Sequence, residues 1–313
     1  MNKKGLTYLL TVSLITVVLL GIFLSQQDFA FQQAQRVEGS KIYAMNDFIK
    51  DINSDMERVM EIGSYRAFIA MEDYISIRED FLDDVEETML EVFTQGTIDG
   101  ASALLMNDSS LDYYFESVNN LMNRRGINVD YNVLDLSLQH KTPWDVEMTV
   151  MLNILVFDVE NTANWNYTQN FSSTISVLNL RDPLYSVKTS GNVPNTIIPQ
   201  NQSFNSLNIL EDHIQNSHYI PAEEAPSFLQ RFENNLSGSE FGIESIINVW
   251  ELDAQNIFVH QERVKIDYIY FNDLLVGDVA CDFSGLDSTL HLVLPQINLE
   301  RYGLNETSHE TNC

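Results

Sequence analysis

The chain has 313 residues, which is enough for about two domains of ordinary size. Hydrophobic residues make up 44% and aromatic residues 11%, so a wholly disordered chain, a collagen and a small disulfide scaffold are excluded. The net charge is −28, from 45 Asp and Glu against 17 Lys and Arg. Because such a chain repels phosphate groups, nucleic acids and anionic lipid headgroups are not expected as partners.

A long uncharged segment lies close to the N-terminus. Leu6 to Leu24 carries no charge, and as a helix it would span about 28 Å, close to the hydrocarbon core of a bilayer. Lys3 and Lys4 precede it and the first charge after it is Asp28, so the positive-inside bias places the N-terminus in the cytoplasm. A cleaved secretory signal is the alternative, but it would be shorter and end at small residues. We predict a single-pass membrane helix within residues 1–25, with the bulk of the chain extracellular or at the cell surface.

Lys3, Lys4 and Gly5, followed directly by the apolar run, resemble the class III signal of type IV pilin-like proteins. In that class a dedicated peptidase cuts after the Gly and leaves the hydrophobic helix on the mature chain. The resemblance implies a processing site between Gly5 and Leu6, with both lysines read by the peptidase, and a helix that is anchor and assembly face. Bacterial pilins carry a Glu five positions into the mature chain, where this sequence has Leu10. An uncut single-pass anchor is the alternative.

Residues 26–95 are predicted to form a long helical region. From Ile42 to Val59 apolar residues recur at alternating steps of three and four, which is typical of an amphipathic helix lying on its own domain, with a short coiled coil as the alternative. Gly63 and Ser64 are expected to break the register before a second stripe from Phe68 onwards. Two packed helices or one kinked helix would bury both stripes. The acidic run at 79–91 is expected to be a solvated face.

Residues 96–186 are predicted to form a helix plus antiparallel sheet domain. A short helix is expected from about Ser110 to Asn123. Apolar and polar residues then alternate in three successive segments, which predicts an antiparallel meander with strands near 127–133, 146–156 and 171–177. Pro143 is expected to open the middle strand, where a missing backbone donor does least harm. Helices on one face of such a sheet define an α+β fold.

A turn at residues 181–185 is expected to close this domain, followed by a linker at 187–206 that is rich in Asn, Ser, Gly and Pro. A second, smaller α+β domain is predicted at 207–305, with a tail at 306–313. Pro226 is placed for the first turn of a helix in this domain. Apolar residues alternate over 264–270, which predicts a strand there. The expected fold class is therefore α+β, in which an N-terminal transmembrane helix continues into long helices and two domains follow.

Several segments extend the resemblance beyond the anchor. In chain order they are the KKG segment, a long helix, PWDVEMTV at 143–150, RDPLY at 181–185, residues 228–248 and DYIYF at 267–271. Their order resembles large uncharacterised pilin-like exported proteins of archaea. The resemblance implies a surface or pseudoperiplasmic location and no activity.

The sequence carries no motif typical of a nucleotide-binding loop, a zinc protease or a serine hydrolase. We therefore predict no catalytic residues and no cofactor. His213 and His218 lie near two acids, but a spacing of five does not place both histidines on one helical face, so no metal site is predicted. Asp278, Asp282 and Asp287 lack the spacing of an EF-hand loop. The acidic surface could still recruit divalent cations.

Two kinds of covalent modification suit an exported protein. Cys281 and Cys313 are the only cysteines and form a candidate disulfide, with a buried Cys281 and a free Cys313 as the alternative. Candidate glycosylation sites occur in six Asn-x-Ser/Thr sequons, at Asn107, Asn166, Asn170, Asn201, Asn235 and Asn305.

Taken together, these patterns predict a non-enzymatic pilin-like, surface-structural or adhesive protein. Its expected partners are the membrane, through Leu6 to Leu24, and other pilin-like subunits or the export machinery. One alternative is a membrane-anchored ligand-binding or hydrolytic ectodomain with its site between the two domains. Another is a partner subunit that binds a second exported protein through the stripe between Ile42 and Val59.

Overall fold

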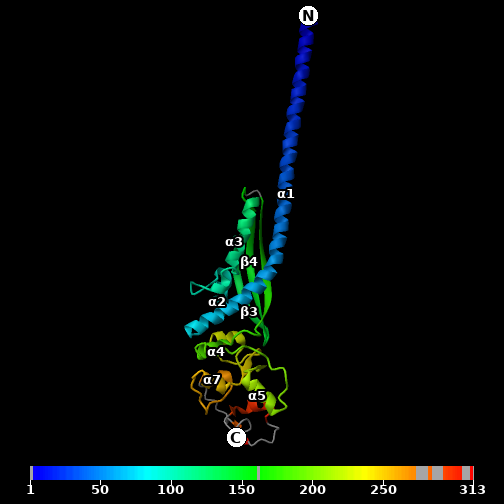
Figure 1. The fold of residues 1–313 in the computed structure, drawn as a ribbon. Coiled ribbons are helices and arrows are strands. Elements are labelled where there is room, and N and C mark those ends of the chain that lie inside the picture. The colour runs from blue at the N-terminus through cyan, green and yellow to red at the C-terminus, as the bar shows by residue number, and fades with distance from the viewer. Residues whose placement is uncertain (1–2, 161–162, 273–280, 284–291, 305–310, 313) are drawn as a thin grey trace.

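The computed structural model describes residues 3–160, 163–272, 281–283, 292–304 and 311–312. It confirms an α+β fold in which helices pack on antiparallel sheets. A single long helix, a sheet unit and a smaller second unit follow one another along the molecule, with the N-terminus and the C-terminus at opposite ends (Figure 1).

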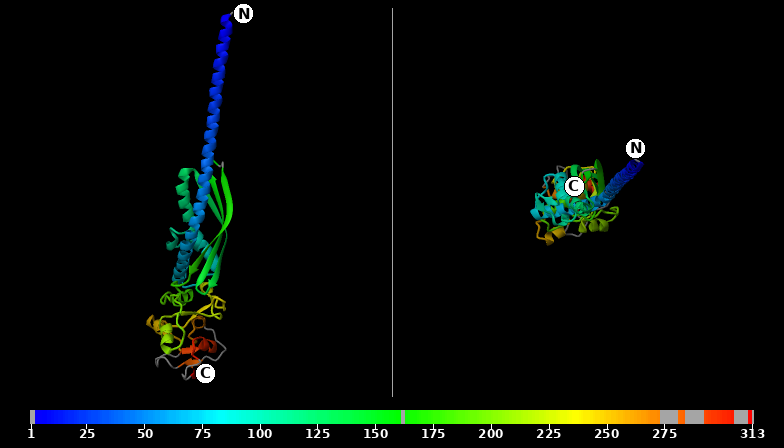
Figure 2. Two further views of the ribbon diagram at one scale, coloured as in Figure 1. Left: turned by 90° about the vertical axis from the view of Figure 1, so that its right-hand side faces the viewer. Right: turned by 90° about the horizontal axis from the view of Figure 1, so that it is seen from above.

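Helix α1 (Lys3–Arg78) has 76 residues and is therefore about 114 Å long. Its N-terminal part extends away from the rest of the molecule, while its C-terminal part lies along the sheet (Figures 1 and 2). Lys41 marks the point where the helix reaches the body, because its Nζ lies 2.7 Å from Glu160 Oε2 and 3.7 Å from Asp158 Oδ2. In the part of the chain that the structure describes, no helix combines the length and the apolar character needed to cross a membrane.

Helix α1 continues through Gly63 and Ser64 to Arg78, so the change of apolar register expected there occurs within one helix. A Cβ atom at Gly63 would lie 2.8 Å from a ring carbon of Phe93 and 3.2 Å from the carbonyl oxygen of Ser109. The glycine therefore allows a neighbouring helix to approach closely, and it does not end the helix. Figure 1 shows α1 bending where it crosses the sheet, which fits the alternative of one kinked helix.

Helix α2 (Val85–Gln95) packs against α1, and the second apolar stripe, from Phe68 to Val92, is divided between the end of α1 and α2. Asp84 caps its start by accepting a hydrogen bond from the N–H of Glu87, and Gly96 ends it in the left-handed conformation with φ 74°. The elements between α2 and the sheet are short: β1 (Thr97–Ile98), β2 (Ala101–Ser102), the 3₁₀ helix η1 (Leu104–Met106), α3 (Leu111–Met122) and the 3₁₀ helix η2 (Asn123–Arg125).

The predicted meander is confirmed as a three-stranded sheet of β3 (Ile127–Thr142), β4 (Asp145–Asp158) and β5 (Asn164–Ser176). Every second side chain of β4 is buried, including Val150, which pairs in register with Leu136 and Phe171. Pro143 does not open the middle strand. Thr142 pairs with Asp145, so the proline lies in the turn between β3 and β4, where it also removes no ladder hydrogen bond.

The second unit has its own hydrophobic core and consists of short elements. Strand β6 pairs with β7, and β8 pairs with β9 and β10. In chain order the elements are α4 (Pro183–Lys188), α5 (Leu207–Gln215), β6 (Tyr219–Pro221), α6 (Phe228–Phe232), β7 (Ile243–Ser245), α7 (Val249–Ala254), α8 (Asp267–Tyr270), β8 (Cys281–Phe283), β9 (Leu292–Leu294), α9 (Gln296–Arg301) and β10 (Thr311–Asn312).

Three expectations for this region are corrected. Residues 181–185 do not form a closing turn, because Asp182 caps α4 and Pro183 is its first residue. The expected linker is partly buried, since Val193 is 3% exposed and Ile197 is 0% exposed. The strand expected at 264–270 is wrong, because its second half forms α8. All seven of these side chains are buried, so alternation could not distinguish a strand from a helical turn.

Helix α6 confirms the helix expected after Pro226, with a shift in its first residue. Ser227 is the N-cap, and its side chain and that of Gln230 form a reciprocal capping box. Pro226 therefore precedes the cap instead of lying in the first turn. Figure 1 places the second unit at the end of the molecule farthest from the N-terminus.

Candidate functional site

The first candidate site is the projecting part of α1. The predicted processing residues Lys3, Lys4, Gly5 and Leu6 lie in its first turns. Every large apolar side chain described between Tyr8 and Leu24 is more than half exposed, from 51% to 77%. These side chains follow one another closely enough to cover all sides of the helix. The exposed apolar surface therefore surrounds the helix on all sides and is not confined to one stripe.

The side chains of the apolar stripe farther along α1, from Ile42 to Val59, are mostly buried or half-buried. Met45, Ile52 and Met56 are 0–1% exposed, because α1 packs on β5 and β4. Only Ile42, at the start of the stripe, is exposed, at 46%. The prediction of an amphipathic helix lying on its own domain is thus confirmed. Since the chain's own sheet covers this stripe, it is not open to a partner subunit.

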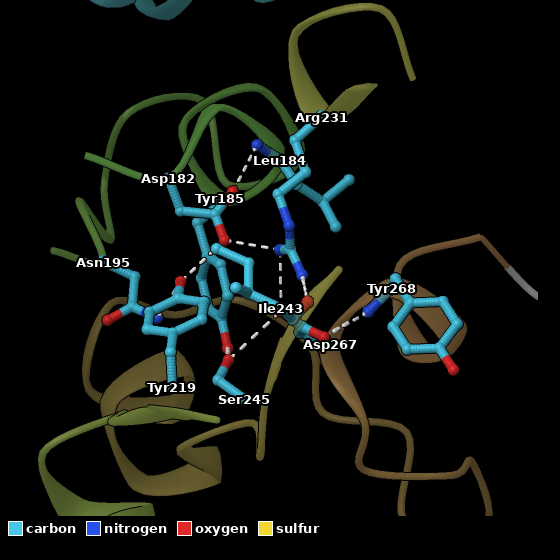
Figure 3. A network of polar contacts seen from close by, with 10 residues as sticks. All are labelled: Asp182, Leu184, Tyr185, Asn195, Tyr219, Arg231, Ile243, Ser245, Asp267 and Tyr268. Atoms are coloured by element: carbon cyan, nitrogen blue, oxygen red, sulfur yellow. Dashed lines mark hydrogen bonds and ion pairs between the residues drawn. The ribbon is translucent and has the colours of Figure 1, made fainter. Parts of the chain in front are cut away.

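The second candidate site is a buried ionic cluster in the second unit (Figure 3). Nη1 of Arg231 donates to Asp182 Oδ2 at 2.6 Å and to Asp267 Oδ2 at 2.8 Å, and Nη2 donates to the carbonyl oxygen of Ile243. All three charged side chains are completely buried. The two carboxylates and the carbonyl offset part of the desolvation of the arginine's charge, while its Nε has no hydrogen-bond partner among the described residues.

Hydroxyl and amide groups surround the cluster (Figure 3). Tyr219 donates to Asp182 Oδ2 at 2.6 Å and accepts from Asn195 Nδ2 at 2.7 Å. Ser245 donates to Asp267 Oδ2 at 3.2 Å and lies 3.1 Å from the hydroxyl of Tyr185. Burial raises the pKa of both tyrosines well above the ordinary value, so they act as neutral hydrogen-bonding groups.

The cluster ties together elements that are far apart in the sequence. Asp182 caps α4, Arg231 belongs to α6 and Asp267 is the first residue of α8. Burial raises the pKa of Asp267, and the neighbouring Arg231 acts in the opposite direction. Because none of the three charged groups reaches solvent, the arrangement suits holding these elements in place and not turnover of a substrate. Sequence reasoning missed the cluster, although Asp before Pro was a signal for the cap of α4.

Two further titratable groups lie where the sheet unit meets the second unit. Glu72 of α1 is 2% exposed beside α4, and burial raises its pKa to about 8. Its Oε1 has no hydrogen-bond partner among the described residues. His140 of β3 accepts from the N–H of Leu229 at 3.4 Å through Nε2, and burial lowers its pKa. The contact between the units therefore contains buried groups held in their neutral forms.

His213 and His218 do not share a helical face, because α5 ends at Gln215, yet their rings lie close together. Ser217, with φ 48°, reverses the chain after α5, so the two imidazole rings lie 6.2 Å apart. His213 is fully buried beside Phe204 and Tyr302, and burial lowers its pKa to about 3. Within the described residues no three His, Cys, Asp or Glu side chains are arranged to hold a metal ion. We therefore interpret His213 as a neutral core histidine. Asp278 and Asp287 lie outside the described residues.

The predicted modification sites are only partly within the described chain. Five sequon asparagines are exposed, namely Asn107, Asn166, Asn170, Asn201 and Asn235, and Asn305 lies outside the described residues. Cys281 is the first residue of β8, and its neighbour Asp282 pairs with Asn312 of β10. Cys313 lies outside the described residues. Glycosylation and the disulfide both stay predictions.

Comparison with known protein families, curated proteins and solved structures gave no match.

Proposed function

We propose that the chain is a non-enzymatic, pilin-like surface protein that is anchored by the N-terminal part of α1 and carries an acidic body outside the cell. The observation that carries this proposal is that exposed apolar side chains surround the helix between Tyr8 and Leu24. A projecting helix of this kind is not stable in water on its own, because helices owe most of their stability to packing of an apolar surface. A bilayer, or a bundle of such helices in an assembly, would cover it.

Two further features support an anchor in this position. Leu6 to Leu24 carries no charge and is flanked on one side by Lys3 and Lys4. The helix then continues for more than four further turns before Lys41 joins it to the sheet unit, so the body stands clear of the apolar segment. The stripe from Met45 to Met56 is buried on the chain's own sheet, whereas the large apolar side chains described between Tyr8 and Leu24 are exposed on all sides of the helix.

The proposal is tested by expressing the full chain in a host that has a class III signal peptidase. We expect the chain to stay with membranes after alkaline extraction and the N-terminal peptide to have the mass of a chain that starts at Leu6. Val17→Lys with Leu20→Lys should release the chain, because each lysine in the middle of an inserted helix costs about 3 kcal/mol. Tyr43→Lys is the matched control, since Tyr43 is exposed on α1 outside this segment.

A start at Met1 with membrane retention would leave an anchored ectodomain and remove the pilin-like route. Recovery of the unmodified chain in the soluble fraction would refute the anchor itself. In the first case the alternative of a ligand-binding or hydrolytic ectodomain becomes the next hypothesis to test.

A further inference from the structure

A groove runs along α1, between this helix and the part of the chain that contains residues 98–105 and α3. Seven α1 residues at steps of three or four form its floor: Asp55, Val59, Ile62, Arg66, Ala70, Asp73 and Ile77. Two hollows lie along this stripe. One, of about 320 Å³, is bounded by α3, and the other, of about 220 Å³, is bounded by residues 98–105. Between them Arg66 donates to Asp108 Oδ1 at 2.7 Å. The stripe covers about 33 Å of helix.

Large apolar side chains line the groove and remain open to solvent. Ile77 and Leu104 are each 83% exposed, and both line the second hollow. Ile62 and Tyr113 line the first hollow and are 40% and 47% exposed. Single exposed apolar residues are ordinary on a protein surface, but a series of them along one groove indicates a binding surface.

An acidic cleft adjoins the second hollow. The cleft has a volume of about 330 Å³ and shares Tyr74 and Ile98 with the hollow. Six acids line it, namely Asp80, Asp83, Asp84, Glu87, Glu91 and Asp99. Its one lining cation, Arg78, is paired with Asp99 at 2.6 Å. The cleft therefore presents a strongly negative surface at one end of an apolar groove.

We propose that this groove binds an amphipathic helix of a partner protein, with the apolar stripe of the helix in the two hollows and Lys or Arg residues at its end over the acidic cleft. Val59 in the first hollow and Asp73 in the second are 14 residues apart in the sequence, so two anchor side chains about four turns apart on one face of a partner helix would reach both hollows. The acids select the basic end and fix the direction of the helix, because opposite charges across an interface determine register and suppress wrong partners. This inference goes beyond the proposed function and does not depend on the anchor.

The probe is a synthetic amphipathic helix of Leu and Lys, labelled for fluorescence anisotropy and titrated into the full chain. A peptide with the same Leu pattern and Glu in place of Lys is the charge control. We expect the Leu and Lys peptide to bind and the Leu and Glu peptide not to bind. Ile77→Ser with Leu104→Ser should weaken binding about 100-fold, since each side chain of this size accounts for about 10-fold when it is buried on binding. Both residues are so exposed that the fold should be unaffected.

The charge contribution is tested with Asp83→Asn and Glu87→Gln together. We expect binding to weaken about 5-fold and to depend less steeply on salt. Two matched controls lie on the second unit. Phe258→Ser removes an apolar side chain that is 76% exposed, and Glu251→Gln with Asp253→Asn removes two exposed acids. Both controls should bind the peptide as the parent chain does.

Equal binding by all variants would show that the peptide responds only to the overall negative charge, and would overturn the proposal. Equal binding of the Leu and Glu peptide would overturn the role of the acidic cleft. A second copy of the chain is the other occupant to examine. If the parent chain forms dimers that Ile77→Ser with Leu104→Ser abolishes, the groove joins two copies and the proposed partner helix is wrong.

Discussion

The sheet unit and the second unit both have fully buried interiors, but they differ in what fills them. Strand β4 buries six alternating apolar side chains between Val146 and Val156 under the helices of the sheet unit. The second unit combines its smaller apolar core with Arg231, Asp182 and Asp267, all of them completely buried. Apolar packing tolerates many arrangements of similar volume, whereas a buried charge needs partners at specific positions. The comparison suggests that the second unit is more sensitive than the sheet unit to single polar changes.

The largest expected effect comes from Arg231→Met. The substitution leaves two carboxylates buried with no cation, which should destabilise the second unit by about 3 to 5 kcal/mol. Hydrogen exchange of the full chain should show lost protection in α4, α6 and α8 while β4 stays protected. Arg66→Met removes an exposed pair with Asp108 and should cost less than about 1 kcal/mol. Equal destabilisation by the two substitutions would show that the second unit is no more sensitive to such changes than the sheet unit.

An intermediate effect is expected for Glu72, which lies where the two units meet. Its folded pKa of about 8 is above the ordinary value of 4.5, so the folded chain holds this proton more tightly than the unfolded chain. Stability should therefore fall as the pH rises from about 4.5 to about 8. Glu72→Gln stays neutral and should be more stable than the parent at pH 8, by on the order of 3 kcal/mol, and similar to it at pH 4.5.

Urea unfolding of both chains across this pH range measures the difference. Glu61→Gln is the control, because Glu61 is exposed on the same helix. A parent chain and a Glu72→Gln chain with parallel stability profiles would show that Glu72 is not buried as an uncharged group.

The smallest expected change in stability concerns the packing of the sheet unit, and its sign is what tests the packing. Gly63→Ala would improve helix propensity by about 1 kcal/mol, but its new methyl group would meet the ring of Phe93. Because overpacking outweighs propensity, we expect a net loss of about 1 to 2 kcal/mol in thermal unfolding. At Gly39 no atom lies within 4 Å of an added Cβ, so Gly39→Ala should be neutral or slightly stabilising. Stabilisation by Gly63→Ala would refute the close helix contact.

Regular alternation explains how much of the fold could be predicted. The three strands of the meander and the first stripe of α1 follow directly from the period of their apolar residues, because one face of each element is buried and the other is not. The same rule failed at 264–270, where every side chain is buried. The sequence also left open whether α1 continues past Gly63, since it does not show whether a glycine in a helix ends it or admits a neighbour.

The candidate sites also differ in whether the sequence alone could reveal them. The apolar segment from Leu6 to Leu24 could be found from the sequence alone, because uncharged length is a local property. The groove on α1 could not, since Ile77 and Leu104 form a surface only when residues 98–105 fold back onto the helix. The short distance between the rings of His213 and His218 likewise depends on Ser217, whose backbone is in the left-handed conformation.

By itself the sequence determined the acidic character of the chain, the long apolar N-terminal segment and the α+β order of helices followed by a meander. These depend on composition and on contacts between residues that are near in sequence. Only the tertiary structure decided which stripe of α1 is buried, where the groove and its acidic end lie, and that Asp182, Arg231 and Asp267 meet. The physical reason is that a charge or an apolar side chain has no defined partner until segments distant in the sequence come together, as those of Arg231 and Asp267, 36 residues apart, do.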